Sequence, residues 1–448
     1  MRSVSGKRYS DFTKRYSDFR YNLRMEEKRR YQFIAEINSA FTPGAPIDSK
    51  DLFAGRKKQR EKVIGTIFQK GQHAILFGER GVGKTSLANT LFDFLVLMGQ
   101  FNYGRARVNC SDSTEFGDIW RSVFKQLTYS PDAQTTLSAE DLLPNDPSPE
   151  NVKETFQMLD SRSIVVIDEL DRIGDPYIRT QLADTIKTLS DNAIDTTLIL
   201  VGVGDTIEQL ISVLESVLRA LVHVPMQRMS KGELLEIIDQ GLLKCEGLSI
   251  DPYVRERIAD YCHGLPFYTH LLAREAALNC VANDFTHISL GDLEYAVQQA
   301  VDSHLESLLT GYNKAVSAPR GTNHRQVLLA CALALKNEQR LFFAGDVMEP
   351  LKCITGKAYK VPAFAKHLKD FCEESHGPII DKRGPARKVQ YRFIAPLMEP
   401  YVILRGLAEK MIQEGQLVPA SIIPASERST AFGQLSLLPP SSVPPIEF

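Results

Sequence analysis

Residues 78–85 have the composition and spacing of a phosphate-binding loop. They read Gly78, Glu79, Arg80, Gly81, Val82, Gly83, Lys84 and Thr85, which fits the pattern G-x-x-x-x-G-K-[ST] at every fixed position. In such a loop, backbone N–H groups bind phosphate oxygens, the lysine reaches the β- and γ-phosphates of a nucleotide, and the hydroxyl binds Mg²⁺. ATP and Mg²⁺ are therefore the expected ligands of this loop and of Ser86 beside it. The alternative is a glycine-rich turn that binds nothing.

The segments that must position this loop are a strand and a helix. Residues 74–77 are apolar and predict a buried strand before the loop, and residues 86–92 predict a helix after it. The start of that helix would direct the positive end of its dipole at a bound anion. The strand–loop–helix order is the setting that the motif requires.

Two carboxylates follow a second apolar run, residues 163–167. A near-continuous apolar strand is typical of a parallel sheet covered on both faces, and ligands of such sheets bind at the carboxyl ends of the strands. We therefore expect Asp168 to bind Mg²⁺ and Glu169 to orient or deprotonate an attacking water. The alternative is a solvated strand end, which the complete phosphate loop upstream disfavours.

The wider pattern predicts an α/β P-loop NTPase with a parallel sheet, an all-α lid and a C-terminal winged-helix domain. Between residues 50 and 226 apolar runs alternate with helical patterns. The expected strands are 73–77, 105–109, 163–167, 196–203 and 221–226. The polar stretch 128–150 is expected to be a surface loop, and 230–300 to be helical throughout. The expected regions are a basic arm and helix (1–46), an α/β ATPase domain (47–228), a helical lid (229–305), a linker (306–322), a winged-helix domain (323–412) and a disordered tail (413–448).

Composition limits the classes of protein that fit. The 448 residues carry a net charge of −2, so the chain as a whole is not a basic nucleic-acid binder, although residues 1–30 hold ten Lys or Arg against four acids. That arm is either solvated or contacts nucleic acid or a membrane surface. The seven cysteines include no C-x-x-C, and the nine histidines lack metal-ligand spacing. Without an apolar run of membrane-spanning length or a signal core, we expect a cytoplasmic protein and no membrane partner.

The order of these motifs resembles that of the AAA+ ATPases, specifically the origin-recognition and initiator-loader branch and its STAND-like relatives, over roughly residues 47–300. Phe53 and Arg56, in the sequence Phe-Ala-Gly-Arg, resemble the segment that packs by the adenine. Asn109 resembles the polar residue that restrains the catalytic glutamate, Asp205 stands where the first sensor is placed, and Arg219 resembles the arginine finger. The resemblance implies that Arg219 acts on the ATP of a neighbouring subunit, and hence a homo-oligomer.

Two positions depart from the initiator pattern. Initiator lids carry an arginine after a glycine, whereas this chain reads Gly264, Leu265 and Pro266, which resembles the G-x-P signature of STAND ATPases. Asp205 replaces an asparagine, and an acid there would repel a γ-phosphate unless Mg²⁺ or a lysine intervenes. Arg219 could instead be a helix C-terminal residue favoured by the dipole, and Asn109 an ordinary turn residue.

Residues 323–412 resemble a winged helix, with helices at 325–334, 344–354 and 361–374, a strand at 341–343 and a hairpin at 378–380 and 388–394 around a basic turn, 381–387. If it binds DNA, helix 361–374 would enter the major groove. The basic side chains expected to face the duplex or to contact phosphates are Lys366, His367, Lys369, Lys382, Arg383, Arg387, Lys388 and Arg392. The alternative is a winged helix that contacts protein.

The tail 418–448 has the proline- and serine-rich composition of disorder. Within it Gln434, Leu435, Leu437 and Leu438 resemble the short motif by which bacterial proteins bind the replicative sliding clamp. The alternative is an unused, leucine-containing end.

These features together predict an ATP-binding and ATP-hydrolysing molecular switch that couples its nucleotide state to DNA, through the winged helix, and to oligomer assembly. The alternative function is a STAND-type signalling or defence ATPase whose winged helix binds protein. A scaffold without turnover is a third class, and the intact Lys84, Asp168 and Glu169 argue against it.

Overall fold

The computed structural model describes residues 25–47, 50–99, 103–132, 135–204, 207, 210, 215–302, 306–317, 323–385 and 388–412. The chain divides into two compact units between Ala296 and Val297. Asp205, Arg387, the basic stretch 1–24 and the tail 413–448 with its clamp-like motif lie outside the described residues, so the expectations for them stay predictions.

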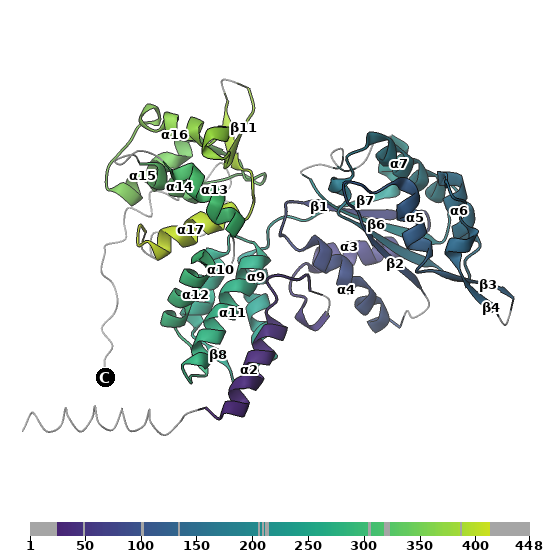
Figure 1. Cartoon of the computed structure of the whole chain (residues 1–448), viewed down its shortest axis with the longest axis horizontal. Helices are drawn as coiled ribbons and strands as arrows, with labels where there is room; N and C mark the ends of the chain where they lie inside the picture. The colour runs from purple at the N-terminus through teal and green to yellow at the C-terminus, as the bar shows by residue number, and fades with distance from the viewer. Residues whose placement is uncertain are drawn as a thin grey trace, which may run out of the picture. The chain divides into compact units, whose positions relative to one another are not determined.

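A five-stranded parallel sheet forms the centre of the first unit (Figure 1). Its strands are β1 (His73–Gly78), β2 (Gly104–Asn109), β5 (Ser163–Asp168), β6 (Thr196–Val203) and β7 (Leu221–Pro225). They lie in the order β2-β5-β6-β1-β7, and every neighbouring pair is parallel. The five strands predicted from the sequence are confirmed. Every residue of β5 is buried, which explains why this strand is almost continuously apolar.

Helices cover both faces of the sheet (Figure 1). One face carries α5 (Phe116–Phe124), α6 (Pro149–Gln157) and α7 (Pro176–Asp191), and the other carries α3 (Lys57–Ile67) and α4 (Lys84–Leu97). On the first face the ring of Trp120 is fully buried and meets Phe156 edge to face, with centroids 5.8 Å apart. Such an aromatic pair contributes about 0.5–1.5 kcal/mol beyond its area burial.

The prediction of a surface loop over residues 128–150 was wrong for its first half. An antiparallel hairpin forms there from β3 (Thr128–Asp132) and β4 (Thr135–Ser138), followed by a 3-10 turn, η2 (Ala139–Leu142). Threonine, tyrosine and leucine on these strands suit a β-ribbon. Pro131 conceals the pattern, but proline is tolerated in a two-stranded ribbon because both strands are edges.

The second part of the first unit is a helical lid. It contains α9 (Lys231–Leu243), α10 (Pro252–Tyr261), α11 (Pro266–Ala282) and α12 (Leu290–Asp302), within which the unit boundary falls. The N-terminal helix α2 (Glu27–Ala40), which lies within the predicted arm and helix 1–46, packs on α9 and α11 (Figure 1). The expectation that 230–300 is helical throughout was wrong for two short segments. There β8 (Ser249–Ile250) and β9 (His287–Ile288) pair as short parallel strands.

The second unit has the element order of a winged helix. Its core elements are α14 (His324–Leu333), β10 (Phe342–Phe343), α15 (Met348–Thr355), α16 (Ala365–Asp370), β11 (Ile380–Arg383) and β12 (Gln390–Phe393). The strands form an antiparallel sheet in the order β10-β12-β11. Two further helices, α13 (Glu306–Val316) and α17 (Met398–Ala408), pack against this core. Helix α13 lies in the stretch 301–322, for which the sequence predicts a helix followed by a Ser/Pro/Gly linker.

Three details of the winged helix differ from the prediction. Helix 361–374 is much shorter, because Phe364 has a φ of −125° and separates a 3-10 turn, η6 (Val361–Ala363), from the six-residue α16. Residues 381–383, expected in the turn, belong to β11. His367 does not face solvent with its neighbours but is half-buried, with its ring 4.5 Å from that of His324.

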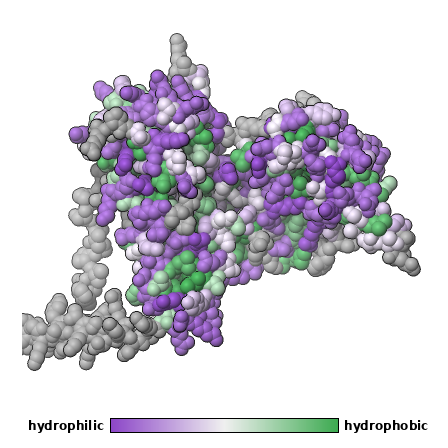
Figure 2. Space-filling model, in the orientation of Figure 1, coloured by the Kyte–Doolittle hydropathy of each residue, from purple (hydrophilic) through white to green (hydrophobic). Residues whose placement is uncertain are grey.

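The viewed face of each unit is mostly hydrophilic, with apolar residues in small areas (Figure 2). Among the described residues, no helix has both the length and the apolar composition needed to cross a bilayer.

Candidate nucleotide site

The phosphate loop connects the end of β1 with the start of α4. Gly78, Gly81 and Gly83 have φ values of +152°, +87° and +92°, which L side chains rarely adopt. A Cβ on Gly78 would lie 2.2 Å from the carbonyl oxygen of Met226, so this position requires glycine. The first turn of a helix leaves backbone N–H groups without partners inside the helix. In α4 this turn follows the loop directly, which is the geometry that favours an anion.

Lys84 lies inside this loop. Its Nζ donates to the carbonyl oxygens of Gly78, at 2.9 Å, and Glu79, at 2.8 Å. Burial lowers the pKa of Lys84 to about 8, although the nearby carboxylates of Asp171, Asp168 and Glu79 oppose this shift. Carbonyl oxygens of the loop thus hold the ammonium group at the place where phosphates would bind.

Asp168 ends β5 with a buried carboxylate. Its Oδ2 accepts from Arg107, on β2, at 2.9 Å, and its Oδ1 accepts from the backbone N–H of Glu169 at 2.8 Å. Sequence reasoning missed Arg107. Its position on β2 could have revealed it. Strands β2 and β5 are parallel and Asn109 lies opposite Asp168, so Arg107, two residues before Asn109, lies on the same face of the sheet as Asp168.

Glu169 follows in the left-handed region, with a φ of +58°. Its carboxylate is half-exposed and pairs with Arg172 at 3.4 Å. Asn109 lies opposite Asp168 in the β2–β5 register, but its exposed side chain makes no hydrogen bond with Glu169 among the described residues. Restraint of Glu169 by Asn109 therefore stays a prediction.

Arg219 lies in the last turn of α8 (Glu215–Ala220) and is exposed. Leu221, two residues on, pairs with His73 at the start of β1, whereas the phosphate loop follows the end of that strand. At about 3.3 Å per residue the two ends of β1 are roughly 17 Å apart. Arg219 is therefore remote from the phosphate loop of its own chain.

Arg56 connects the phosphate loop with the lid. Its guanidinium is buried and donates to the carbonyl oxygens of Val82, at 2.8 Å, and Gln227, at 2.6 Å, while its backbone N–H donates to Glu233 on α9 at 2.8 Å. Burial lowers the pKa of Arg56 to about 10, and Glu233 partly offsets the effect. Phe53, three residues earlier, is buried, and its ring meets Phe94 of α4 at 6.1 Å.

A second connection joins the loop to the G-x-P segment. Arg228, between β7 and α9, donates to both carboxylate oxygens of Glu79, at 2.6 and 3.2 Å, and to the carbonyl oxygen of His263 at 3.1 Å. Gly264 has a φ of +81°, and its carbonyl oxygen accepts from the N–H of Met229 at 2.9 Å. Pro266 is the first residue of α11. Sequence reasoning missed Arg228 because Glu79 lies 149 residues away.

The donor set fits a nucleotide with a divalent ion. The half-buried hydroxyl of Thr85 and the carboxylate of Asp168 are the oxygen ligands that Mg²⁺ prefers. Ser86 serves another contact, since its Oγ accepts from the N–H of Ile47 at 3.1 Å.

A family comparison agrees with this geometry. Residues 68–211 match the AAA domain. This AAA domain match contains the phosphate loop, Asp168 and Glu169, and covers less than half of the chain. No curated protein matches the sequence significantly.

Solved structures share the P-loop AAA fold. A Walker-type ATPase of Pyrococcus abyssi is similar with a TM-score of 0.50 and 16% identity, over 81% of this chain and 99% of that one. The ORC2 protein of Aeropyrum pernix, solved as ADPNP–ADP complexes, gives a TM-score of 0.47 and 14% identity over 83% and 96%. The ORC1 protein of the same organism, solved with DNA, gives 0.43 and 15% over 81% and 95%. The first similarity concerns the fold alone, and the two lower scores support no inference.

Proposed function

We propose that this chain is an ATP-dependent molecular switch that binds and hydrolyses ATP with Mg²⁺ and couples its nucleotide state to DNA and to homo-oligomer assembly. The observation that carries this proposal is the double connection of the phosphate loop to the lid, through Arg56 and through Glu79 and Arg228. A change in the loop when phosphates bind would therefore act directly on the lid.

The proposed chemistry follows from the contacts of each side chain. Lys84 would exchange the carbonyl oxygens of Gly78 and Glu79 for the β- and γ-phosphate oxygens. Glu169, with a half-exposed carboxylate beside the buried Asp168, would orient or deprotonate the attacking water. Asn109 would restrain Glu169, and Asp205 would act as the first sensor residue.

Thr85 and Asp168 are the residues that would hold Mg²⁺, which neutralises charge on the phosphate oxygens. In the structure Asp168 Oδ2 is paired with the guanidinium of Arg107. Arg107 therefore competes with a cation for this oxygen. When Mg²⁺ binds, Asp168 Oδ2 would exchange the guanidinium of Arg107 for the ion.

Arg219 would act in trans. Its exposure and its distance from its own phosphate loop support a contact with the γ-phosphate bound by a neighbouring copy. Hydrolysis would then require assembly, because each site is complete only with the arginine of the next subunit.

The winged helix offers a basic surface for DNA. Exposed basic residues lie on α16 and the wing, namely Lys366, Lys369, Lys382, Arg383 and Lys388. Helix α16 has six residues and is therefore only about 9 Å long. A helix this short reaches few base edges, so phosphate contacts would dominate binding.

DNA binding by the full chain tests this surface. Lys382→Glu combined with Lys388→Glu should weaken binding at least tenfold and flatten its salt dependence, since each phosphate contact contributes a slope of about −0.9 in log K against log salt. Lys352→Glu is the control, because Lys352 is also an exposed lysine of this unit but lies on α15. Equal losses in both variants, or none in either, would remove DNA from the proposal.

The STAND-type alternative rests on the lid. The lid contacts residues 228 and 229 through backbone carbonyl groups. His263 accepts from the side chain of Arg228, and Gly264 accepts from the N–H of Met229. No cationic side chain directly after Gly264 takes this role, because Leu265 and Pro266 follow it. In this version the winged helix binds protein, and ATP turnover would be unchanged by DNA. Turnover of the full chain measured with and without duplex DNA separates the two functions.

The clamp-like motif of the tail is proposed as a weak contact. Gln434 would donate and accept hydrogen bonds in a polar pocket, and the leucines 435, 437 and 438 would fill an apolar one. Full-length protein should bind a bacterial sliding clamp with about micromolar affinity. The double change Gln434→Ala and Leu437→Ala should abolish that binding. Absence of saturable binding by the unaltered chain would remove the clamp as a partner.

A further inference from the structure

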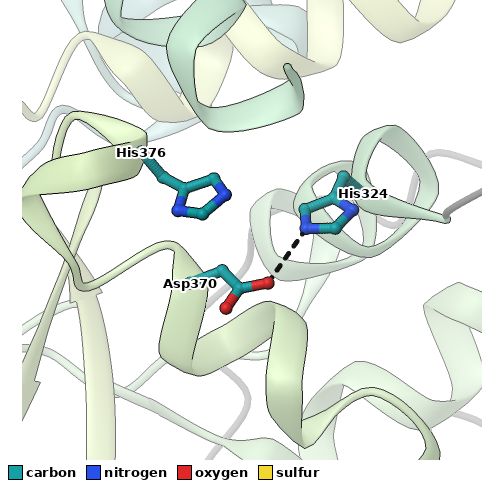
Figure 3. Close-up of side chains that lie close together, drawn as sticks. All are labelled: His324, Asp370 and His376. Carbon is teal, nitrogen blue, oxygen red and sulfur yellow. Dashed lines mark hydrogen bonds and ion pairs between the residues drawn. The ribbon is translucent and has the colours of Figure 1, made fainter. Parts of the chain in front are cut away.

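Three side chains with metal-ligating atoms converge in the winged-helix domain (Figure 3). His324 begins α14, Asp370 ends α16, and His376 ends a 3-10 turn, η7 (Glu374–His376). Their ligating atoms all lie within 4.8 Å of one another. The spacing matches no metal motif, because 46 residues separate His324 from Asp370. Only the fold brings the three together.

The distances suit a small divalent ion. His324 Nε2 and Asp370 Oδ2 are 3.2 Å apart. Two ligands that are each about 2.0–2.1 Å from a tetrahedral zinc ion lie about 3.4 Å from each other. The pair therefore already has the separation of two zinc ligands. His376 lies at the end of a single turn and is half-buried, so rotation of its side chain can close the remaining distance.

The two ring nitrogens of His376 have different surroundings. Its Nδ1 is 3.1 Å from the hydroxyl oxygen of Ser375, which leaves Nε2 for a ligand. A hydrogen bond to the second ring nitrogen commonly orients histidines that bind metals. The ring is stacked on that of His324, with centroids 6.0 Å apart and planes at 9°. In the view of Figure 3 the carboxylate of Asp370 lies below the two rings, and a dashed line joins it to His324.

The surroundings are enclosed. His324 and Asp370 are 6% and 9% exposed. The ring of His367 lies 4.5 Å from that of His324, beside the three ligands. A carboxylate enclosed in this way needs a compensating positive charge, which a cation bound by Asp370 and by Nε2 of His324 would supply.

We propose that His324, Asp370 and His376 bind a divalent transition-metal ion of the zinc class. Two imidazoles and one carboxylate match the three-ligand zinc sites that keep a fourth position open for water. Nitrogen ligands disfavour Mg²⁺ and Ca²⁺ here, since those ions take oxygen ligands. The bound ion would connect the start of α14, the end of α16 and η7, and would thus fix the helix that carries Lys366 and Lys369.

Metal titration of the full-length, metal-free and nucleotide-free chain tests this site. Zn²⁺, and Co²⁺ as its spectroscopic probe, should bind with one equivalent at the cluster, and Zn²⁺ should raise the melting temperature. His376→Asn is the main variant because His376 is only half-buried. It should lower the affinity of that equivalent at least tenfold and remove the thermal shift. His376→Cys, which restores a zinc ligand, should recover both.

Two controls separate the cluster from other cation sites. His287→Asn changes an exposed lid histidine, and Asp168→Asn removes the carboxylate of the nucleotide site. Both should keep the zinc equivalent. The proposal is overturned if His376→Asn binds Zn²⁺ as the unaltered chain does, or if the unaltered chain binds none at micromolar concentration. Either result would leave the contact of His324 with Asp370 as a structural hydrogen bond.

Discussion

Arg228 forms a bidentate ion pair with Glu79 of the phosphate loop, with N–O distances of 2.6 and 3.2 Å. The same guanidinium donates to the carbonyl oxygen of His263, at the turn before the lid helix α11. Both side chains are largely buried, 9% and 20% exposed, so solvent screens the pair weakly. Arg228 thus links the phosphate loop to the lid, in addition to the link through Arg56.

Breaking this pair should uncouple the lid from the nucleotide. In the unaltered chain, ATP should slow hydrogen exchange of residues 263–269. Arg228→Ala should still bind ATP but lose most of this protection, because the connection from Glu79 to the lid is gone. Arg80→Ala changes an exposed residue of the same loop and is the matched control. If ATP protects residues 263–269 fully in Arg228→Ala, the contacts of Arg228 do not transmit nucleotide binding to the lid.

Nucleotide affinity should depend on pH through Lys84. Burial holds the pKa of Lys84 at about 8 in the free protein. Bound phosphates stabilise the ammonium form and raise this pKa, so binding takes up a proton above about pH 8. The affinity for ATP should therefore be constant below about pH 8 and fall as the pH rises above it. Calorimetry in buffers of different ionisation enthalpy measures both effects, and a constant affinity up to about pH 9.5 would contradict the assignment.

Arg107 should set the Mg²⁺ requirement. Its guanidinium occupies Asp168 Oδ2, an oxygen proposed to bind the ion. Arg107→Ala should lower the Mg²⁺ concentration for half-maximal turnover by roughly two- to fivefold, the range of a partly exposed ion pair. The control is Arg105→Ala, on the same strand, whose guanidinium lies over the ring of Phe92 instead. An unchanged or higher requirement would show that Arg107 does not compete with the ion.

Arg219 should act between subunits. Arg219→Ala should lower turnover at least a hundredfold without weakening ATP binding, because a finger stabilises charge that develops on the γ-phosphate. Mixing Arg219→Ala with Glu169→Gln protein should restore part of the activity, since some interfaces then hold an intact Glu169 site and an intact Arg219. If the mixture is no more active than the separate variants, a role in trans is excluded.

Features that depend on consecutive residues could be predicted from the sequence. The five strands and the phosphate loop were predicted because apolar runs and glycine spacing are local signals. Arg228 and the cluster at His324 could not be predicted, because their partners are remote in the sequence. The hairpin at 128–138 was hidden by a proline and polar residues. Helix α16 was overestimated because helical periodicity continues across Phe364, where the backbone leaves the helical range.

The central claim is that this chain binds ATP at Lys84 and hydrolyses it with Glu169. The most direct measurement compares ATP binding and turnover of the unaltered chain, Lys84→Ala and Glu169→Gln in parallel, with folding checked by circular dichroism. We predict that Lys84→Ala loses nucleotide binding, and that Glu169→Gln binds ATP as the unaltered chain does while its turnover falls at least a hundredfold. Equal loss of binding in both folded variants, or no turnover by the unaltered chain with ATP, Mg²⁺ and DNA, would contradict the account.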